Sequence, residues 1–92
     1  MKFMVKLTGS NFNNAALQWS CPVCSQGRLF VAISKDDPPV FYISCEECDT
    51  EWASPEASKH AQMAEQYGSY SFSRYILFDE VYGHDWEKFI DR

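Results

Sequence analysis

Hydrophobic residues alternate with polar or smaller ones in short stretches of the first half of the chain. Between positions 28 and 34, for example, Leu29, Val31 and Ile33 fall on one face of an extended segment. A period of two with β-branched and aromatic members is typical of strands with one buried face. We therefore predict strands at residues 1–7, 15–20, 28–34 and 40–44, with a loop at residues 8–14.

A polar segment with two consecutive prolines, residues 34–39, separates the last two predicted strands. Proline, aspartate and serine are the residues that favour turns, so this segment predicts a hairpin. A hairpin brings the outer ends of its two strands together. The residues just before position 28 and just after position 44 should therefore meet in space.

The pattern changes after residue 53. Ser54 and Pro55 followed by an acid are typical of a helix start, and a narrow apolar stripe at Met63 and Tyr67 is followed by Gly68. We predict a helix at 55–67, an extended segment at 69–73 and further short helices at 74–83 and 84–90.

Four cysteines occur as two pairs, each with two residues between the thiols: Cys21 and Cys24, then Cys45 and Cys48. Each spacing lets one tight turn aim both sulfurs at one point, and the predicted hairpin brings the two turns together. Zinc is the favoured interpretation; two disulfides, a rubredoxin-like iron site and a redox function are the alternatives. In the first turn Pro22 presets one backbone angle, and Gly27 can supply a positive φ just beyond it.

On these cysteines, Pro22 and the intervening hairpin, residues 15–52 resemble a zinc ribbon, although Ser25 and Asp49 stand where many ribbon turns carry glycine. Zinc held by four sulfurs has no open position, so the resemblance implies a structural site. We expect one α+β domain over residues 1–92, with a zinc-ribbon hairpin core, an N-terminal strand and two or three short helices in a C-terminal part at 54–92.

Acidic side chains outnumber basic ones by 13 to 8, giving a net charge of −5 and a pI near 4.8. Four thiolates and one zinc ion bring the charge to about −7. This balance disfavours binding to a nucleic-acid backbone and favours a basic protein partner. No signal peptide or membrane span is recognisable, so we expect a cytoplasmic protein with reduced thiols.

No catalytic constellation is visible, so we expect neither enzyme activity nor a small-molecule substrate. His60 is interpreted as a solvated helix residue and His84 as a turn or cap residue. Acids flank the second cysteine pair and recur among aromatic residues near the C-terminus, where they either are solvated or contact the partner. The candidate partner-binding residues are Glu46, Glu47, Asp49, Glu51, Asp79, Glu80, Trp86 and Glu87.

In its small size, acidity and ribbon-plus-helices layout, the chain resembles bacterial immunity proteins, which neutralise toxins that are often basic nucleases. The resemblance implies a non-catalytic inhibitor of a basic toxin. The alternative is a nucleic-acid-binding or transcription-associated zinc ribbon, in which Trp19, Arg28 and Lys35 would contact the nucleic acid. A subunit of a larger assembly, in which the ribbon only stabilises the fold, is a third possibility.

Overall fold

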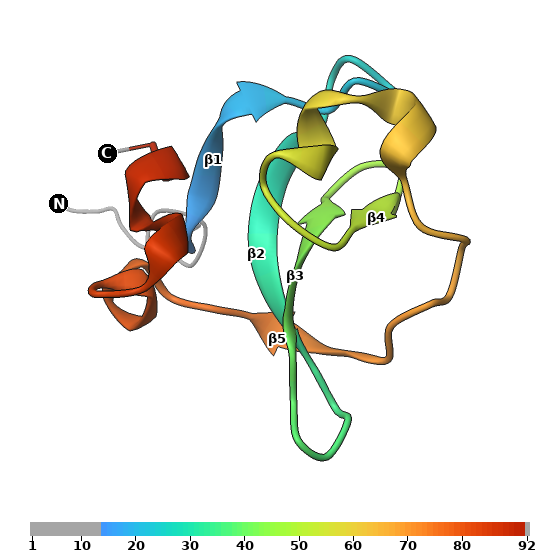
Figure 1. Cartoon of the computed structure of the whole chain (residues 1–92). Helices are drawn as coiled ribbons and strands as arrows, with labels where there is room; N and C mark the ends of the chain where they lie inside the picture. Colours follow the sequence, from blue (N-terminus) through green and yellow to red (C-terminus); the bar gives the residue numbers. More distant parts are fainter. Residues whose placement is uncertain (1–13, 92) are drawn as a thin grey trace, which may run out of the picture.

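The computed structural model describes residues 14–91, which form one antiparallel sheet with short 3₁₀ turns packed around it (Figure 1). The predicted strand at 1–7 and most of the predicted loop at 8–14 lie outside the described residues. The strands are β1 (Ala16–Ser20), β2 (Arg28–Ser34), β3 (Phe41–Cys45), β4 (Glu51–Trp52) and β5 (Phe72–Tyr75). The turns are η2 (Ala57–Lys59), η3 (Ala61–Met63), η4 (Phe78–Val81) and η5 (Asp85–Phe89).

Strand β2 is the centre of the sheet. One of its edges pairs with β3 from Leu29, opposite Cys45, to Ile33, opposite Phe41. Its other edge is shared by two strands, because β1 pairs with its first residues and β5 with its last. The change of partner occurs at Val31, whose N–H donates to Ala15 and whose carbonyl accepts from Ile76. Both edges of β2 are thereby hydrogen-bonded along most of its length.

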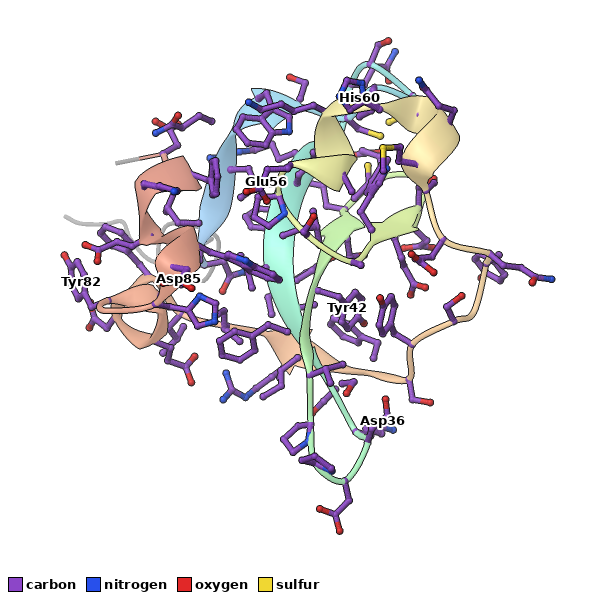
Figure 2. The ribbon with its side chains drawn as sticks, in the orientation of Figure 1. Asp36, Tyr42, Glu56, His60, Tyr82 and Asp85 are labelled. Carbon is purple, nitrogen blue, oxygen red and sulfur yellow. The ribbon has the colours of Figure 1, made fainter. Side chains whose placement is uncertain are left out.

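The hairpin of β2 and β3 confirms the prediction from the alternating pattern and the proline-containing turn. In Figure 2, Asp36 lies at the hairpin turn and His60 at the opposite end of the sheet. That opposite end is where the cysteine turns are placed, because β2 begins four residues after Cys24 and β3 ends at Cys45. The sheet therefore carries the two cysteine pairs on its strand ends.

The prediction of an α+β fold with two or three C-terminal helices is wrong. Among residues 14–91 only 3₁₀ turns are present, and the segment predicted as a helix at 55–67 contains two of them, η2 and η3. Ser54 does cap the first turn, its Oγ accepting from the Ala57 N–H at 3.2 Å. His60 then adopts an extended conformation, with φ −130° and ψ 119°, and interrupts the turn.

Bonds to the sheet replace the helical hydrogen bonds of this segment. The Trp52 indole donates to the His60 carbonyl at 3.0 Å, and the Glu65 N–H donates to the Glu51 carbonyl at 2.8 Å. Met63 and Tyr67 are exposed, so an amphipathic helix would bury no apolar stripe here. Since a short helix depends on such burial for its stability, the segment follows the sheet instead.

The prediction of a helix at 74–83 is also wrong, because its first residues belong to β5 and only Phe78–Val81 form a turn, η4. The free second half of the β2 edge supplies hydrogen-bonding groups that Arg74, Tyr75 and Ile76 take up. Of the residues predicted as a short helix at 84–90, Asp85–Phe89 form the 3₁₀ turn η5. The chain then returns to β1, where Ile90 pairs with Leu17 and the Asp91 N–H donates to the Ala16 carbonyl (Figure 1).

The sheet has two buried faces with different composition. One face carries Leu29, Val31, Ile43 and the wholly buried Trp52, which form an aliphatic core with Ile76, Val81 and Ile90. The other face carries Phe30, Tyr42 and Tyr75, and is aromatic. Residues directly opposite in an antiparallel pair share a face, so Glu51, which pairs with Ser44, belongs to the aromatic face.

In the described part of the chain, we find no helix whose length and apolar character would allow it to cross a membrane.

Candidate functional site

The four cysteine sulfurs lie together at the end of the hairpin, all within 4.8 Å of one another. The Sγ atoms of Cys21 and Cys48 are 3.7 Å apart, and those of Cys24 and Cys45 are 3.6 Å apart. A tetrahedral zinc ion with Zn–S bonds of about 2.3 Å requires sulfurs about 3.8 Å apart. The four cysteines are free thiols. The sequence prediction that they converge on one point is confirmed, and the arrangement suits a metal ion.

The two cysteine turns have the same backbone construction. In the first, the Ser25 N–H donates to the Cys21 carbonyl, and in the second the Asp49 N–H donates to the Cys45 carbonyl. Ser25 and Asp49 follow the second cysteine of each pair and have positive φ angles of 65° and 62°. Both therefore adopt the conformation that glycine adopts most easily.

Backbone N–H groups point at the sulfurs from inside these turns. The N–H of Val23 donates to the Cys21 Sγ at 3.3 Å, and that of Gly27 donates to the Cys24 Sγ at 3.3 Å. In the second turn the Glu47 N–H donates to the Cys45 Sγ at 3.4 Å. Hydrogen bonds of this kind stabilise the thiolate, which is the form that binds a metal.

Gly27 has a different role from the predicted one. The positive φ of the first turn occurs at Ser25, not at Gly27. Gly27 is buried, and a Cβ atom at this position would overlap the Cys45 Sγ and the Glu47 side chain. A glycine is needed here because the first turn packs its backbone directly against a sulfur of the second.

The pKa values of the thiols differ according to their surroundings. Backbone N–H groups of Gln26 and Gly27 lower the pKa of Cys24 to about 7, whereas burial raises the pKa of Cys45 to about 12. Burial also raises the pKa of Cys21. Deprotonation of all four thiols at this site therefore costs free energy, and a bound cation would offset that cost.

The acids that flank the second cysteine pair divide into two groups. Glu46, Glu47 and Asp49 are exposed, and within residues 14–91 none of them forms an ion pair. The Glu46 carboxylate accepts from the Arg28 N–H at 3.3 Å. We call these three residues the knuckle acids. Glu51 is separate from them because it lies on β4, half-buried on the aromatic face of the sheet.

The predicted C-terminal cluster is spread over η4 and η5, and several of its members make internal contacts. Glu80 forms a two-pronged ion pair with Arg74, both N–O distances being 2.8 Å. Arg74 and the Leu77 N–H together lower the pKa of Glu80 to about 2. Asp79 is exposed. The Glu87 carboxylate accepts from the Gly83 N–H at 3.0 Å. The carboxylates of Glu80 and Glu87 are therefore less free to contact a partner than the knuckle acids.

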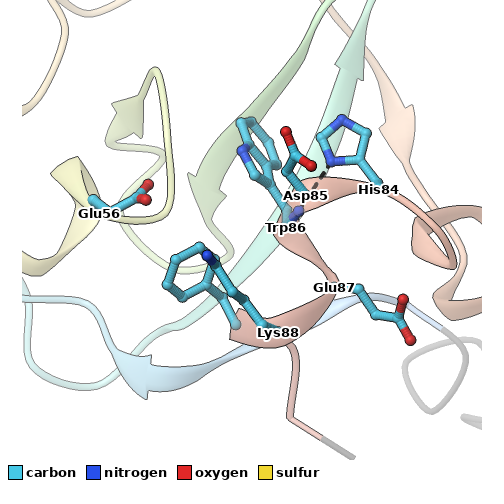
Figure 3. A pocket seen from close by; sticks show the side chains of 7 residues that line it. Glu56, His84, Asp85, Trp86, Glu87 and Lys88 are labelled. Carbon is cyan, nitrogen blue, oxygen red and sulfur yellow. Dashed lines mark hydrogen bonds between the residues drawn. The ribbon is translucent and has the colours of Figure 1, made fainter.

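Trp86 and Glu87 line an open cavity of about 710 Å³ between η5 and Glu56 (Figure 3). Trp86 packs against Phe41, with ring centroids 6.4 Å apart, and is only partly exposed. His84 precedes η5, and its Nδ1 accepts from the Trp86 N–H at 3.1 Å, as the interpretation of a cap residue requires. His60 is exposed, but it lies between two 3₁₀ turns and not in a helix.

Of the side chains considered for nucleic-acid contacts, Arg28 and Lys35 are exposed, whereas Trp19 is partly buried. The Trp19 indole donates to the Ser58 Oγ at 3.0 Å, and the Lys59 ammonium lies 4.7 Å from its ring centroid. The Arg28 guanidinium lies 5.5 Å from the centroid of Phe30. The contacts of Trp19 leave its ring less available for base stacking, and Phe30 is buried.

A second cavity, of about 330 Å³, lies on the aromatic face of the sheet and was not predicted from the sequence. It is lined by Tyr42, Ser44, Asp49, Glu51, Tyr67, Gly68, Tyr70, Phe72 and Tyr75. The only sequence signal was the density of tyrosine and phenylalanine between residues 67 and 75, which predicted an extended segment and nothing more.

Comparison with known proteins gives no match to any family model, curated protein or solved structure, so no relative confirms the resemblance to zinc ribbons or to immunity proteins.

Proposed function

We propose that this protein is a non-catalytic binding module, held together by a structural zinc ion, that binds a basic protein. In its more specific form, the proposal is that it is an immunity protein that neutralises a basic toxin, such as a nuclease. Binding to a basic protein is supported by the net negative charge of the chain and by the exposed position of the knuckle acids. The inhibitory role is supported by the resemblance to immunity proteins.

Four sulfur ligands at these separations suit zinc, which we propose as the bound metal. With all four coordination positions filled, the ion can neither activate water nor polarise a substrate. Its function would be to fix the two cysteine turns against each other, and thus to hold the surface around them rigid.

The observation that carries the proposal is the exposure of the knuckle acids, Glu46, Glu47 and Asp49, on a turn that the metal would make rigid. Rigid, unpaired charges of one sign attract an oppositely charged protein over long range and raise its association rate. The net charge of −5 supports the same choice of partner.

The test begins by capturing a partner on immobilised, zinc-loaded protein from a native lysate at low ionic strength, and identifying it by mass spectrometry. We expect a basic protein in a 1:1 complex whose own activity is abolished by binding. Its association rate should fall at least about tenfold between low and high salt.

Two charge-matched variants locate the contact. Glu46→Gln with Glu47→Gln removes two knuckle charges, and Asp36→Asn with Asp37→Asn removes two charges at the hairpin turn. The first should slow association several-fold at low salt and the second should not. Failure to recover a stoichiometric partner, or recovery of an acidic one, would overturn the proposal, as would equal effects of the two variants.

A further inference from the structure

The cavity on the aromatic face contains two buried oxygen atoms with no hydrogen-bond partner among the described residues: the Tyr42 hydroxyl and the Oε1 of Glu51. Tyr42 as a whole has no exposed surface. A buried polar atom without a partner costs free energy, so structures that keep one often use it for a ligand. Both residues line the same cavity.

The position of these residues follows from the sheet. Tyr42 and Ser44 are two residues apart on β3 and share a face, and Ser44 pairs directly with Glu51 on β4. On the other side, Ala32 of β2 stands opposite both Tyr42 and Tyr75, so a small residue separates two large rings. The floor of the cavity is therefore built from strands that the hydrogen bonds of the sheet hold in place.

The wall opposite the sheet comes from the segment that links η3 to β5. This segment is fixed near both ends, because the Glu65 N–H donates to the Glu51 carbonyl and the Lys35 N–H donates to the Ser71 carbonyl. Between these points Tyr70 stacks on Tyr42, with centroids 4.2 Å apart and the rings 8° from parallel. In Figure 2, Tyr42 lies on the side of the hairpin that faces this segment.

The electrostatics of the cavity favour a cation. Asp49 and Glu51 line it, whereas no lysine, arginine or histidine does so among the described residues. Burial raises the pKa of Glu51, and the charges of Asp49 and Glu65 raise it further, whereas the backbone N–H groups of Tyr70 and Ser69 lower it in part. Burial and the Glu51 charge raise the pKa of Tyr42 to about 12, so its hydroxyl stays neutral. Aromatic rings add a further attraction for a cation placed over their faces.

We propose that this cavity binds the guanidinium group of an arginine side chain. A guanidinium is planar, stacks on aromatic rings and presents several N–H donors, which match tyrosine walls with two separate unpaired acceptors. The volume of about 330 Å³ lies at the low end of the roughly 300–1,000 Å³ of ligand sites, which suits one side chain. The assignment of this arginine to the basic partner rests on the proposed function. The proposal that the cavity binds a guanidinium group does not depend on it.

The test uses the zinc-loaded full chain and a capped Gly-Arg-Gly peptide, followed by NMR titration. Matched peptides carry lysine or citrulline in place of arginine. We expect shift changes at the amides of Gly68, Tyr70 and Glu51, and binding at least about tenfold weaker for citrulline, which keeps the shape but loses the charge. Lysine should bind more weakly than arginine because it lacks the planar fork.

Three variants separate a ligand site from a structural feature. Glu51→Gln should weaken arginine binding about tenfold, and Tyr42→Phe several-fold. Asp37→Asn, at an exposed position of the hairpin turn, should leave it unchanged. Tyr42→Phe should also leave the thermal midpoint unchanged or raise it, because it removes a buried hydroxyl that lacks a partner. A marked fall in that midpoint would show that the hydroxyl has an internal structural role and would overturn the assignment.

Equal binding of the arginine and citrulline peptides would overturn the inference, as would binding of a single-stranded oligonucleotide in place of the arginine peptide. If the arginine peptide binds but no basic protein is found, the proposed function fails and the cavity assignment holds. If a basic protein binds wild-type and Glu51→Gln protein equally, the proposed function holds, but the partner does not place an arginine in this cavity.

Discussion

Single residues at the cysteine turns show how little freedom this site leaves to the backbone. Ser25 and Asp49 occupy the left-handed region, and Gly27 allows the first turn to touch the Cys45 sulfur. Two of these backbone conformations are unexpected from the residue type. Serine rarely adopts a positive φ, whereas Gly27, which could adopt one, does not. The common cause is that both turns must aim two sulfurs and several N–H groups at one point.

Replacement of Gly27 by alanine should destabilise the metal-loaded protein by about 2–3 kcal/mol, because the added Cβ would force the cysteine turns apart. It should also speed loss of the metal to a competing chelator. Urea unfolding and the rate of metal transfer to a coloured chelator measure the two effects.

Gly83→Ala is the matched control. Gly83 has a φ of +83° and open space around it, so alanine there is strained but overlaps nothing. We expect a cost of about 1 kcal/mol and no change in metal retention. If Gly27→Ala kept the metal as well as Gly83→Ala does, the close approach to Cys45 would not matter for the site.

At the scale of elements, the second half of the chain is organised by the sheet and not by its own helical tendency. The segment 55–67 has a capped start and a glycine stop, as predicted, yet it forms two 3₁₀ turns. Contacts of His60 and Glu65 with β4 account for the interruption. The Arg74–Glu80 pair then links β5 to η4.

The Arg74–Glu80 pair gives a pH-dependent contribution to stability whose sign is fixed by the Glu80 pKa. That pKa falls from an ordinary value of 4.5 to about 2 in the folded protein, so the pair stabilises the fold fully above pH 4.5 and its contribution is lost as the pH falls toward 2. Glu80→Gln should lower the urea midpoint slightly at pH 7, because the pair is solvent-exposed.

The difference between wild type and Glu80→Gln should stay constant from pH 7 to about pH 5 and shrink below about pH 4.5. Urea unfolding of both proteins over this range measures it, and metal release at low pH affects both alike. A difference that grew on acidification would contradict the assigned pair.

For the whole molecule, the metal site and the aliphatic core stabilise the same structure. Cys21 and Cys45 belong to the core cluster that contains Trp52, so the sulfur site is continuous with the buried apolar residues. In small domains a metal can supply stability that a thin core cannot. We therefore expect folding to depend on the metal.

Purified protein should contain one zinc ion per chain, measured by elemental analysis. A thiol-reactive mercurial should release it in parallel with loss of NMR shift dispersion, since structural zinc sites of this kind are worth about 10–16 kcal/mol. Cys48→Ser should abolish retention of the ion, whereas Ser20→Ala, beside the first turn, should not. Protein that is free of metal and remains folded in chelator would refute the structural role.

Three features could be predicted from the amino-acid sequence alone: the hairpin, the set of four cysteines and their convergence. These features depend on local spacing and on a period of two, which the chain carries without reference to distant residues. The strand prediction at 28–34 and the four cysteine positions agree with the structure for that reason.

The conformation of residues 54–91 and the tyrosine cavity depend on how separate segments of the chain pack, so neither could be predicted from local sequence patterns. Strand β5 pairs with the part of the β2 edge that β1 leaves free. A hydrogen bond from Trp52 of β4 to the His60 carbonyl interrupts the predicted helix. Both contacts lie outside the segment whose conformation they set. The cavity likewise requires β3, β4, β5 and the 67–72 segment at once. Weak local preferences yield to such long-range hydrogen bonds and burial, because the energy of a short helix in water is small.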